Sequence, residues 1–373
     1  MKKISLVFLG MIIFSIFLYG VSVGTYKIFP YEEMDNLKQL LLDETPKINL
    51  EPVNYQNDIN LLIHIKDTSD IEKFHKILID SIWIQNDYPI SKSPQLIESN
   101  ISDSRYLDLK NLKQIDKFTF EMEYGINSIS YLFIPEQSSG NLIIYHEGHA
   151  GDFINGKDTI NYFLENNYTV LAFSMPLLGL NSQPIVEIDN IGKFKLTSHE
   201  HLRFLESSDF SPLKFFFEPI TVSLNYLEKN YNFSSINMVG LSGGGWTSAI
   251  YPAIDQRVNH SYSIAGSLPI FLRTTQQNYG DYEQWTPSIY SKINYLDLYV
   301  MNSIGDNRKF VQIFNKYDPC CFSGDSSKLY KNEVLDRVNK FENGIFEIYI
   351  DDTHKKHIIS ENALKIIKNS LNN

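Results

Sequence analysis

The hydrophobic pattern of residues 117–373 alternates between short apolar runs and segments with helical periodicity. Residues 118–123 and 128–134 alternate apolar and polar positions around a turn at 125–127, which predicts a β-hairpin. Further strands are expected at 142–145, 169–173, 236–239, 262–264, 310–314 and 345–350. Helices are expected at 159–164, 219–231 with Pro219 in the first turn, 246–254, and from a Ser360 cap to about Leu371. This alternation predicts an α/β fold with a mostly parallel central sheet covered by helices on both faces.

The first 24 residues have a different pattern. Lys2 and Lys3 precede residues 4–24, which contain no charged side chain. About 20 apolar residues suffice to span a bilayer as a helix, and the two lysines favour a cytoplasmic N-terminus. The segment therefore predicts an uncleaved signal-anchor, a single membrane pass with the rest of the chain on the extracytoplasmic side. The alternative is a cleaved signal peptide on a secreted or periplasmic protein, with a weak cleavage site at 21–24.

Residues 25–116 are expected to form a stalk and an N-terminal extension of no known module. Pro30, Pro46 and interspersed charges mark the stalk, and residues 71–83 have the spacing of a helix. The predicted organisation is thus a membrane segment at 1–24, this extension, and one catalytic domain at 117–373.

Composition narrows the classes of function. The formal net charge is −11, whereas proteins that bind nucleic acids normally present a basic surface, so no nucleic-acid partner is expected. The chain is 43% hydrophobic and 21% charged, which excludes a disordered protein. The two cysteines, Cys320 and Cys321, exclude a disulfide scaffold and a four-cysteine zinc site. As neighbours they form either a strained vicinal disulfide or two buried thiols.

The motif Gly240-Leu241-Ser242-Gly243-Gly244 lies between an expected strand and an expected helix. A G-x-S-x-G motif in this context is typical of a nucleophile elbow, a sharp turn that presents the serine hydroxyl at the carboxyl edge of the sheet. No lysine follows as in a P-loop, and the G-x-G-x-x-G fingerprint of dinucleotide sites is missing at this turn. Ser242 is therefore the candidate nucleophile.

An oxyanion hole requires two donors near that serine. The backbone N–H of Gly243, at the start of the helix, is the first candidate. The second is expected in the loop after strand 142–145, from Gly148 or alternatively His149. His146 is expected to brace this loop. The H-E-x-H spacing of His146 and His149 does not match the helical H-E-x-x-H zinc motif, so neither a metal nor a cofactor is expected.

A serine nucleophile needs a base and an orienting acid, in the order serine, acid, histidine along the chain. Asp318 follows the strand 310–314 and is the candidate acid, with Asp306 and Asp325 as competitors. His357 follows the last strand and is the candidate base, and His354 is the alternative.

These four anchors, at 146–149, Ser242, Asp318 and His354/His357, resemble the α/β-hydrolase superfamily over about residues 117–373. The segment Ile144-Tyr-His-Glu-Gly148 is also similar to the H-E-G stretch of dienelactone-hydrolase-like and acetyl-xylan-esterase-like members, although dienelactone hydrolases carry a cysteine nucleophile where this chain has Ser242. The resemblance implies a metal-free serine hydrolase that cleaves a carboxylic ester through an acyl-enzyme.

Two insertions, at about 176–218 and 267–309, are expected to form the cap and the substrate pocket. A small-molecule or glycan ester is the expected substrate. The alternatives are a peptidase of the same fold, or a hydrolase-fold scaffold without activity. Residues 25–116 are too few for the propeller that such peptidases usually carry.

Overall fold

The computed structural model describes residues 12–23, 30, 34 and 58–372, and the chain divides into two units, Met1–Asn49 and Leu50–Asn373. Residues 12–23 of the first unit are helical. None of the helices in the described ranges is both long enough and apolar enough to cross a membrane. Part of the segment predicted to be a signal-anchor, residues 1–11 and 24, lies outside the described residues.

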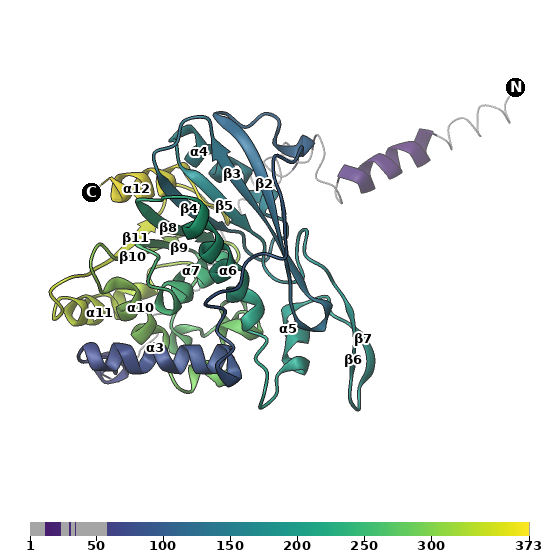
Figure 1. Ribbon diagram of the computed structural model, residues 1–373. Coiled ribbons are helices and arrows are strands. Elements are labelled where there is room, and N and C mark those ends of the chain that lie inside the picture. Colours follow the sequence, from purple (N-terminus) through teal and green to yellow (C-terminus); the bar gives the residue numbers. More distant parts are fainter. Residues whose placement is uncertain (1–11, 24–29, 31–33, 35–57, 373) are drawn as a thin grey trace, which may run out of the picture. The chain divides into compact units, whose positions relative to one another are not determined.

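A nine-stranded sheet forms the centre of the second unit, in the order β1-β2-β3-β5-β4-β8-β9-β10-β11 (Figure 1). Strands β1 to β3 pair antiparallel, β3 pairs antiparallel with β5, and all pairs from β5 to β11 are parallel. The strands are β1 Leu96–Glu98, β2 Leu112–Glu121, β3 Asn127–Pro135, β4 Asn141–His146, β5 Thr169–Phe173, β8 Ser235–Leu241, β9 His260–Ile264, β10 Lys309–Asn315 and β11 Ile345–Asp351. The predicted mostly parallel sheet is confirmed.

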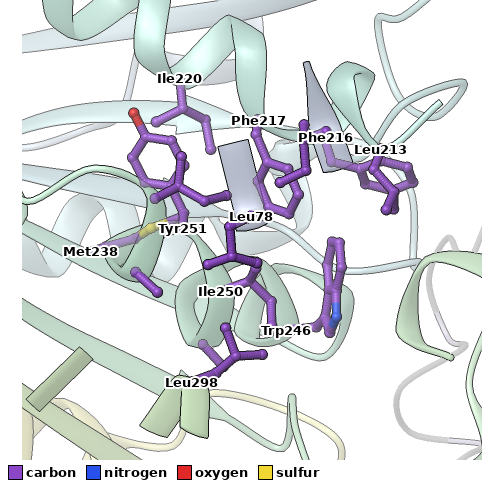
Figure 2. Close-up of a cluster of buried hydrophobic side chains, with 14 of the residues drawn as sticks. Leu78, Leu213, Phe216, Phe217, Ile220, Met238, Trp246, Ile250, Tyr251 and Leu298 are labelled. Atoms are coloured by element: carbon purple, nitrogen blue, oxygen red, sulfur yellow. The ribbon is translucent and has the colours of Figure 1, made fainter. Parts of the chain in front are cut away.

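Helices cover both faces of the sheet (Figure 1). Helices α4 (Lys157–Glu165) and α12 (Glu361–Leu371) bury residues in one apolar cluster, whereas α3, α6, α7, α10 and α11 contribute to the other. The bounds of the latter five are Thr68–Ile82, Lys214–Asn230, Gly243–Ile254, Tyr295–Ser303 and Lys331–Val338. Figure 2 shows the second cluster, in which Trp246 and Tyr251 of α7 lie near Phe217 and Ile220 of α6. This packing holds the helix that follows the elbow rigidly on the sheet.

Helix α3 belongs to the same compact unit as the predicted catalytic domain. Its Leu78 and Ile82 are fully buried, and Leu78 lies within the cluster of Figure 2. The indole N–H of Trp83 donates to Glu218 of α6 at 3.0 Å. Strands β1 and β2 also begin before residue 117 and form one edge of the main sheet. The expected boundary at 117 therefore does not separate two bodies, because residues 58–116 complete the sheet and cover one of its faces.

The structure confirms one local prediction, the Ser360 cap, and contradicts another, the position of Pro219. Ser360 caps the last helix as predicted, since its hydroxyl oxygen accepts the N–H of Ala363 at 3.0 Å. The prediction of Pro219 in a first turn was wrong, because α6 begins at Lys214 and Pro219 lies inside it. The aromatic run 215–217 is buried and supplies the first turn of that helix instead of belonging to the insertion.

The two insertions contain short elements at the carboxyl edge of the sheet. The first contains β6 (Ile185–Ile188) and β7 (Gly192–Lys195), an antiparallel hairpin that projects from the domain, followed by α5 (His199–Leu202) (Figure 1). The second contains α8 (Gln276–Tyr279), a 3-10 turn η8 (Tyr282–Gln284), α9 (Pro287–Tyr290) and α10.

Candidate active site

Ser242 stands between β8 and α7 with φ 57° and ψ −121°, a backbone conformation that non-glycine residues rarely adopt. Two hydrogen bonds hold it there. Its N–H donates to the carbonyl of Ile264 in β9, and its carbonyl accepts the N–H of Trp246, each at 2.9 Å. Strain of this kind persists only where the surrounding structure enforces it, and it concentrates at functional sites.

Two glycines of the motif are explained by close packing around the elbow. A Cβ atom on Gly240 would lie 2.1 Å from the carbonyl oxygen of Gly244. A Cβ atom on Gly244 would lie 1.9 Å from the carbonyl oxygen of His146. No side chain fits at either position. The close packing within the elbow, and between the elbow and the end of β4, therefore requires glycine at these two positions of the G-x-S-x-G motif.

Asp318 and His357 are in direct contact. The Nδ1 atom of His357 lies 2.7 Å from Oδ2 of Asp318, and since an ionised carboxylate only accepts, Nδ1–H donates. Nε2 of His357 is buried and makes no hydrogen bond with any described residue. Since Nδ1 is engaged by Asp318, Nε2 is the ring nitrogen that is available to accept a proton from a nucleophile.

The Asp318 carboxylate is held in place by its own loop. Its Oδ1 accepts the backbone N–H groups of Cys320 at 2.8 Å and Cys321 at 3.2 Å, while Oδ2 also accepts from Asn315 at 3.2 Å. Cys320 and Cys321 form a disulfide, so of the two alternatives left by the sequence the bridge is present. Because hydrogen bonds to carboxylates are strong, these donors fix the orientation of the Asp318 side chain towards His357.

The competing residues lie in other environments. Nε2 of His354 is 3.4 Å from Asp351, not beside Asp318. Asp325 forms an ion pair with Lys328, and Asp306 accepts from the side chain of Asn343. Ser242, Asp318 and His357 each follow the carboxyl end of a parallel strand, β8, β10 and β11, and therefore share one edge of the sheet.

The loop after β4 lies against the nucleophile. A Cβ atom on Gly148 would be 2.6 Å from Cβ of Ser242, so only glycine permits this approach. The N–H of Gly148 itself donates to Oε1 of Glu147 at 2.9 Å. In contrast, the N–H of His149 makes no hydrogen bond with another described residue, and Gly243 is the first residue of α7, where helical bonding leaves the N–H free. The N–H groups of Gly243 and His149 are therefore without a partner among the described residues, whereas the N–H of Gly148, the first choice from the sequence, is engaged by Glu147.

His146 and Glu147 brace this loop from beneath. Both are buried, and Nδ1–H of His146 donates to the carbonyl of Glu147 at 2.9 Å. Burial lowers the pKa of His146 to about 4, which keeps the ring neutral. Burial raises the pKa of Glu147, which also accepts a hydrogen bond from Tyr145 at 2.5 Å. The supporting role expected for His146 matches these contacts.

Four further side chains, those of His149, His199, Asp281 and Glu283, lie together beside the elbow. The sequence did not predict this cluster. His149 lies 3.1 Å from His199 and 3.0 Å from each of the carboxylates of Asp281 and Glu283. Burial lowers the pKa of His149, but the two carboxylates outweigh it and raise the pKa to about 10. Partners 50 and 134 residues apart along the chain leave no spacing motif that could have revealed the cluster.

Solved structures provide the comparison with known proteins, since neither a family model nor a curated protein sequence matches the chain. Acetyl xylan esterase 1 from Thermoanaerobacterium sp. JW/SL YS485 is similar with a TM-score of 0.52 and 15% identity, over 84% of this chain and 98% of that one. The acetyl xylan esterase from Paenibacillus sp. R4 has a TM-score of 0.52 and 13% identity over the same shares of the two chains. The methylesterase BT1017 has a TM-score of 0.54 and 13% identity, over 83% of this chain and 65% of that one. With the sheet order and the strand-elbow-helix at Ser242, these similarities identify the fold as that of the α/β-hydrolases.

Proposed function

We propose that this protein is a serine hydrolase that cleaves carboxylic esters through an acyl-enzyme. The observation that carries the proposal is the hydrogen-bonded pair of Asp318 and His357, at the same sheet edge as a serine in strained elbow geometry. Fold similarity to acetyl xylan esterases and a methylesterase supports ester hydrolysis.

In the proposed reaction, Oγ of Ser242 attacks the ester carbonyl while Nε2 of His357 accepts the hydroxyl proton. Asp318 holds the imidazole in the tautomer with its proton on Nδ1 and stabilises the imidazolium that forms. The N–H groups of Gly243 and His149 stabilise the tetrahedral oxyanion, and each such donor is worth about 10²–10³ in rate. His357 then donates its proton to the leaving alcohol, and water hydrolyses the acyl-enzyme by the same steps in reverse.

We propose a small acyl group on a glycan or small alcohol as the substrate class. Two of the similar structures carry the name acetyl xylan esterase, and a third is a methylesterase. In this chain the ring of His149 lies against Gly243, where a Cβ atom would be 2.6 Å from Cε1 of the histidine. Bulk this close to the oxyanion hole favours short acyl groups over long chains.

Ser242→Ala is the decisive variant. We expect loss of fluorophosphonate labelling and a fall in kcat of at least about 10⁴-fold on p-nitrophenyl acetate. Ser138→Ala, at an exposed serine before β4, serves as the matched control and should behave as wild type. Undiminished turnover by Ser242→Ala would overturn the proposal. A panel of p-nitrophenyl esters and peptide amides distinguishes an esterase from a peptidase, and inactivity on both would indicate a scaffold.

We further propose, from the uncharged segment 4–24 after Lys2 and Lys3, that the enzyme is anchored in a membrane with its catalytic domain on the extracytoplasmic side. Sequencing the N-terminus of the mature protein tests this. A start near residue 25 would indicate a cleaved signal peptide and a secreted product.

A further inference from the structure

We infer that His149, His199, Asp281 and Glu283 form a binding site for one divalent transition-metal ion of the zinc type. One ligand atom from each of the four residues lies within 4.8 Å of every other. They come from three separate segments: the loop after β4, helix α5 of the first insertion, and the turn η8 with the residue before it in the second insertion.

The distances between the ligand atoms match those of a four-coordinate ion. Zinc binds imidazole nitrogen and carboxylate oxygen at about 2.0–2.2 Å, which places neighbouring tetrahedral ligands about 3.3 Å apart. His149 Nε2 lies 3.1 Å from His199 Nδ1, 3.0 Å from Asp281 Oδ2 and 3.0 Å from Glu283 Oε1. His199 Nδ1 lies 3.2 Å from Glu283 Oε2 and 3.9 Å from Asp281 Oδ2. These distances between neighbouring ligand atoms are close to the required spacing, with Glu283 facing His149 through Oε1 and His199 through Oε2.

The tautomer of His199 is already set for metal binding. Its Nε2 lies 2.9 Å from the carbonyl oxygen of Pro176, and a carbonyl only accepts, so the proton is on Nε2. With this proton on Nε2, Nδ1 is the nitrogen through which the ring would bind an ion, and it lies among the other ligand atoms of the cluster. A second imidazole nitrogen bonded to a backbone carbonyl is the usual support for a metal-binding histidine.

The cluster also contains a buried carboxylate oxygen without a hydrogen bond in the described part of the chain. Glu283 is fully buried, and its Oε2 makes no hydrogen bond with any described residue. A buried carboxylate without enough donors is costly unless a cation neutralises it. Two carboxylates and two imidazoles give a neutral complex with a divalent ion, and this mixed nitrogen and oxygen set suits zinc better than magnesium or calcium.

The ion would join both insertions to the loop beside the nucleophile. The ring of His149 faces Gly243, where a Cβ atom would lie 2.8 Å from its Nδ1. An ion on Nε2 fixes this ring and leaves its proton on Nδ1, on the side of the oxyanion hole. The inference concerns binding and does not depend on the proposed esterase activity.

Metal content of the full chain tests the inference. The protein is stripped with a chelator, equilibrated with Zn²⁺, freed of excess ion and analysed by elemental mass spectrometry, and its Tm is measured with and without chelator. We expect about one zinc per chain and a Tm that falls on chelation. His199→Gln and Glu283→Gln should weaken Zn²⁺ binding by at least about 100-fold, since losing even a supporting residue typically costs 10–100-fold.

His201→Gln is the matched control, because His201 lies on the same short helix but has Thr197 as its only hydrogen-bond partner among the described residues. It should retain wild-type zinc content. Titration of the wild-type protein with Co²⁺ is a second test, which does not depend on the folding of any variant. Four-coordinate cobalt would be detected by its intense visible bands. Less than stoichiometric zinc in wild type with no change in Tm, or a full equivalent in His199→Gln, would overturn the inference in favour of a metal-free ion-pair cluster.

Discussion

His357 donates from Nδ1 to Oδ2 of Asp318 across 2.7 Å, although the two residues are 39 positions apart and follow different strands. Strands β10 and β11 pair in parallel over their whole length, from Lys309 opposite Ile345 to Asn315 opposite Asp351. Their carboxyl ends therefore lie side by side, and the loops after them bring the acid and the base together.

Asp318→Asn should reduce kcat by about 10⁴-fold, because an amide in place of the carboxylate permits the wrong imidazole tautomer and no longer stabilises the imidazolium. The measurement is kcat on p-nitrophenyl acetate. Asp325→Asn is the control, since the only ion pair of Asp325 within the described part of the chain is with Lys328 on the surface. A loss of less than about tenfold in Asp318→Asn would exclude this residue as the orienting acid.

His357→Gln and His354→Gln should differ strongly in kcat. His357 is the histidine in contact with Asp318, whereas His354 lies beside Asp351. We expect His357→Gln to lose at least about 10⁴-fold in kcat and His354→Gln to remain within about tenfold of wild type. If the His357 variant retains activity while the His354 variant loses it, the base has been assigned to the wrong residue.

Leu78→Ala should destabilise the catalytic unit by about 2–5 kcal/mol, because it opens a cavity in the cluster between α3, α6 and α7 (Figure 2). Urea unfolding followed by circular dichroism measures this. Leu61→Ala, at a side chain that is 74% exposed, should change the free energy of unfolding by less than about 0.5 kcal/mol. Equal, small effects at both positions would show that residues 58–86 do not belong to the folded core.

His146 should make folding sensitive to acid. Its pKa is about 4 in the folded protein, against 6.5 ordinarily, and burial is the main cause, with smaller repulsion from His149 and His199. Below pH 6.5 the His146 ring binds a proton in the unfolded chain but not in the folded one. The free energy of unfolding therefore decreases as the pH falls from 6.5 to about 4. The slope is about 1.4 kcal/mol per pH unit, or about 3 kcal/mol in total.

The test compares wild type with His146→Asn, whose amide N–H can still donate to the carbonyl of Glu147 but does not titrate. Urea unfolding at pH 7, 5.5 and 4 should show the stability advantage of wild type shrinking by about 3 kcal/mol. His201→Asn, at a more accessible histidine, serves as the control. A difference between wild type and His146→Asn that does not vary with pH would contradict a neutral buried His146.

The sequence by itself determined the features that depend on neighbouring residues. Apolar runs predicted the parallel strands because a strand covered by helices on both faces must be hydrophobic throughout. The glycines around Ser242 predicted the elbow because a tight strand-to-helix turn excludes side chains at those positions, as the contacts of Gly240 and Gly244 show. The Ser360 cap was equally predictable, since it acts within a single helical turn.

Only the tertiary structure decided features that depend on residues distant in sequence. The sequence favoured His357 as the base because it directly precedes the closing helix, but only the path of the loop decided that its ring, and not that of His354, contacts Asp318. Helix α3 joined the core because its apolar stripe packs on α7, a partner far along the chain. The contact between Gly148 and Ser242, and the meeting of His149, His199, Asp281 and Glu283, required the sheet to bring separate loops to one edge. Turns and helix caps can be predicted because they depend on residues adjacent in sequence. The choice between two candidate site residues depends on tertiary packing.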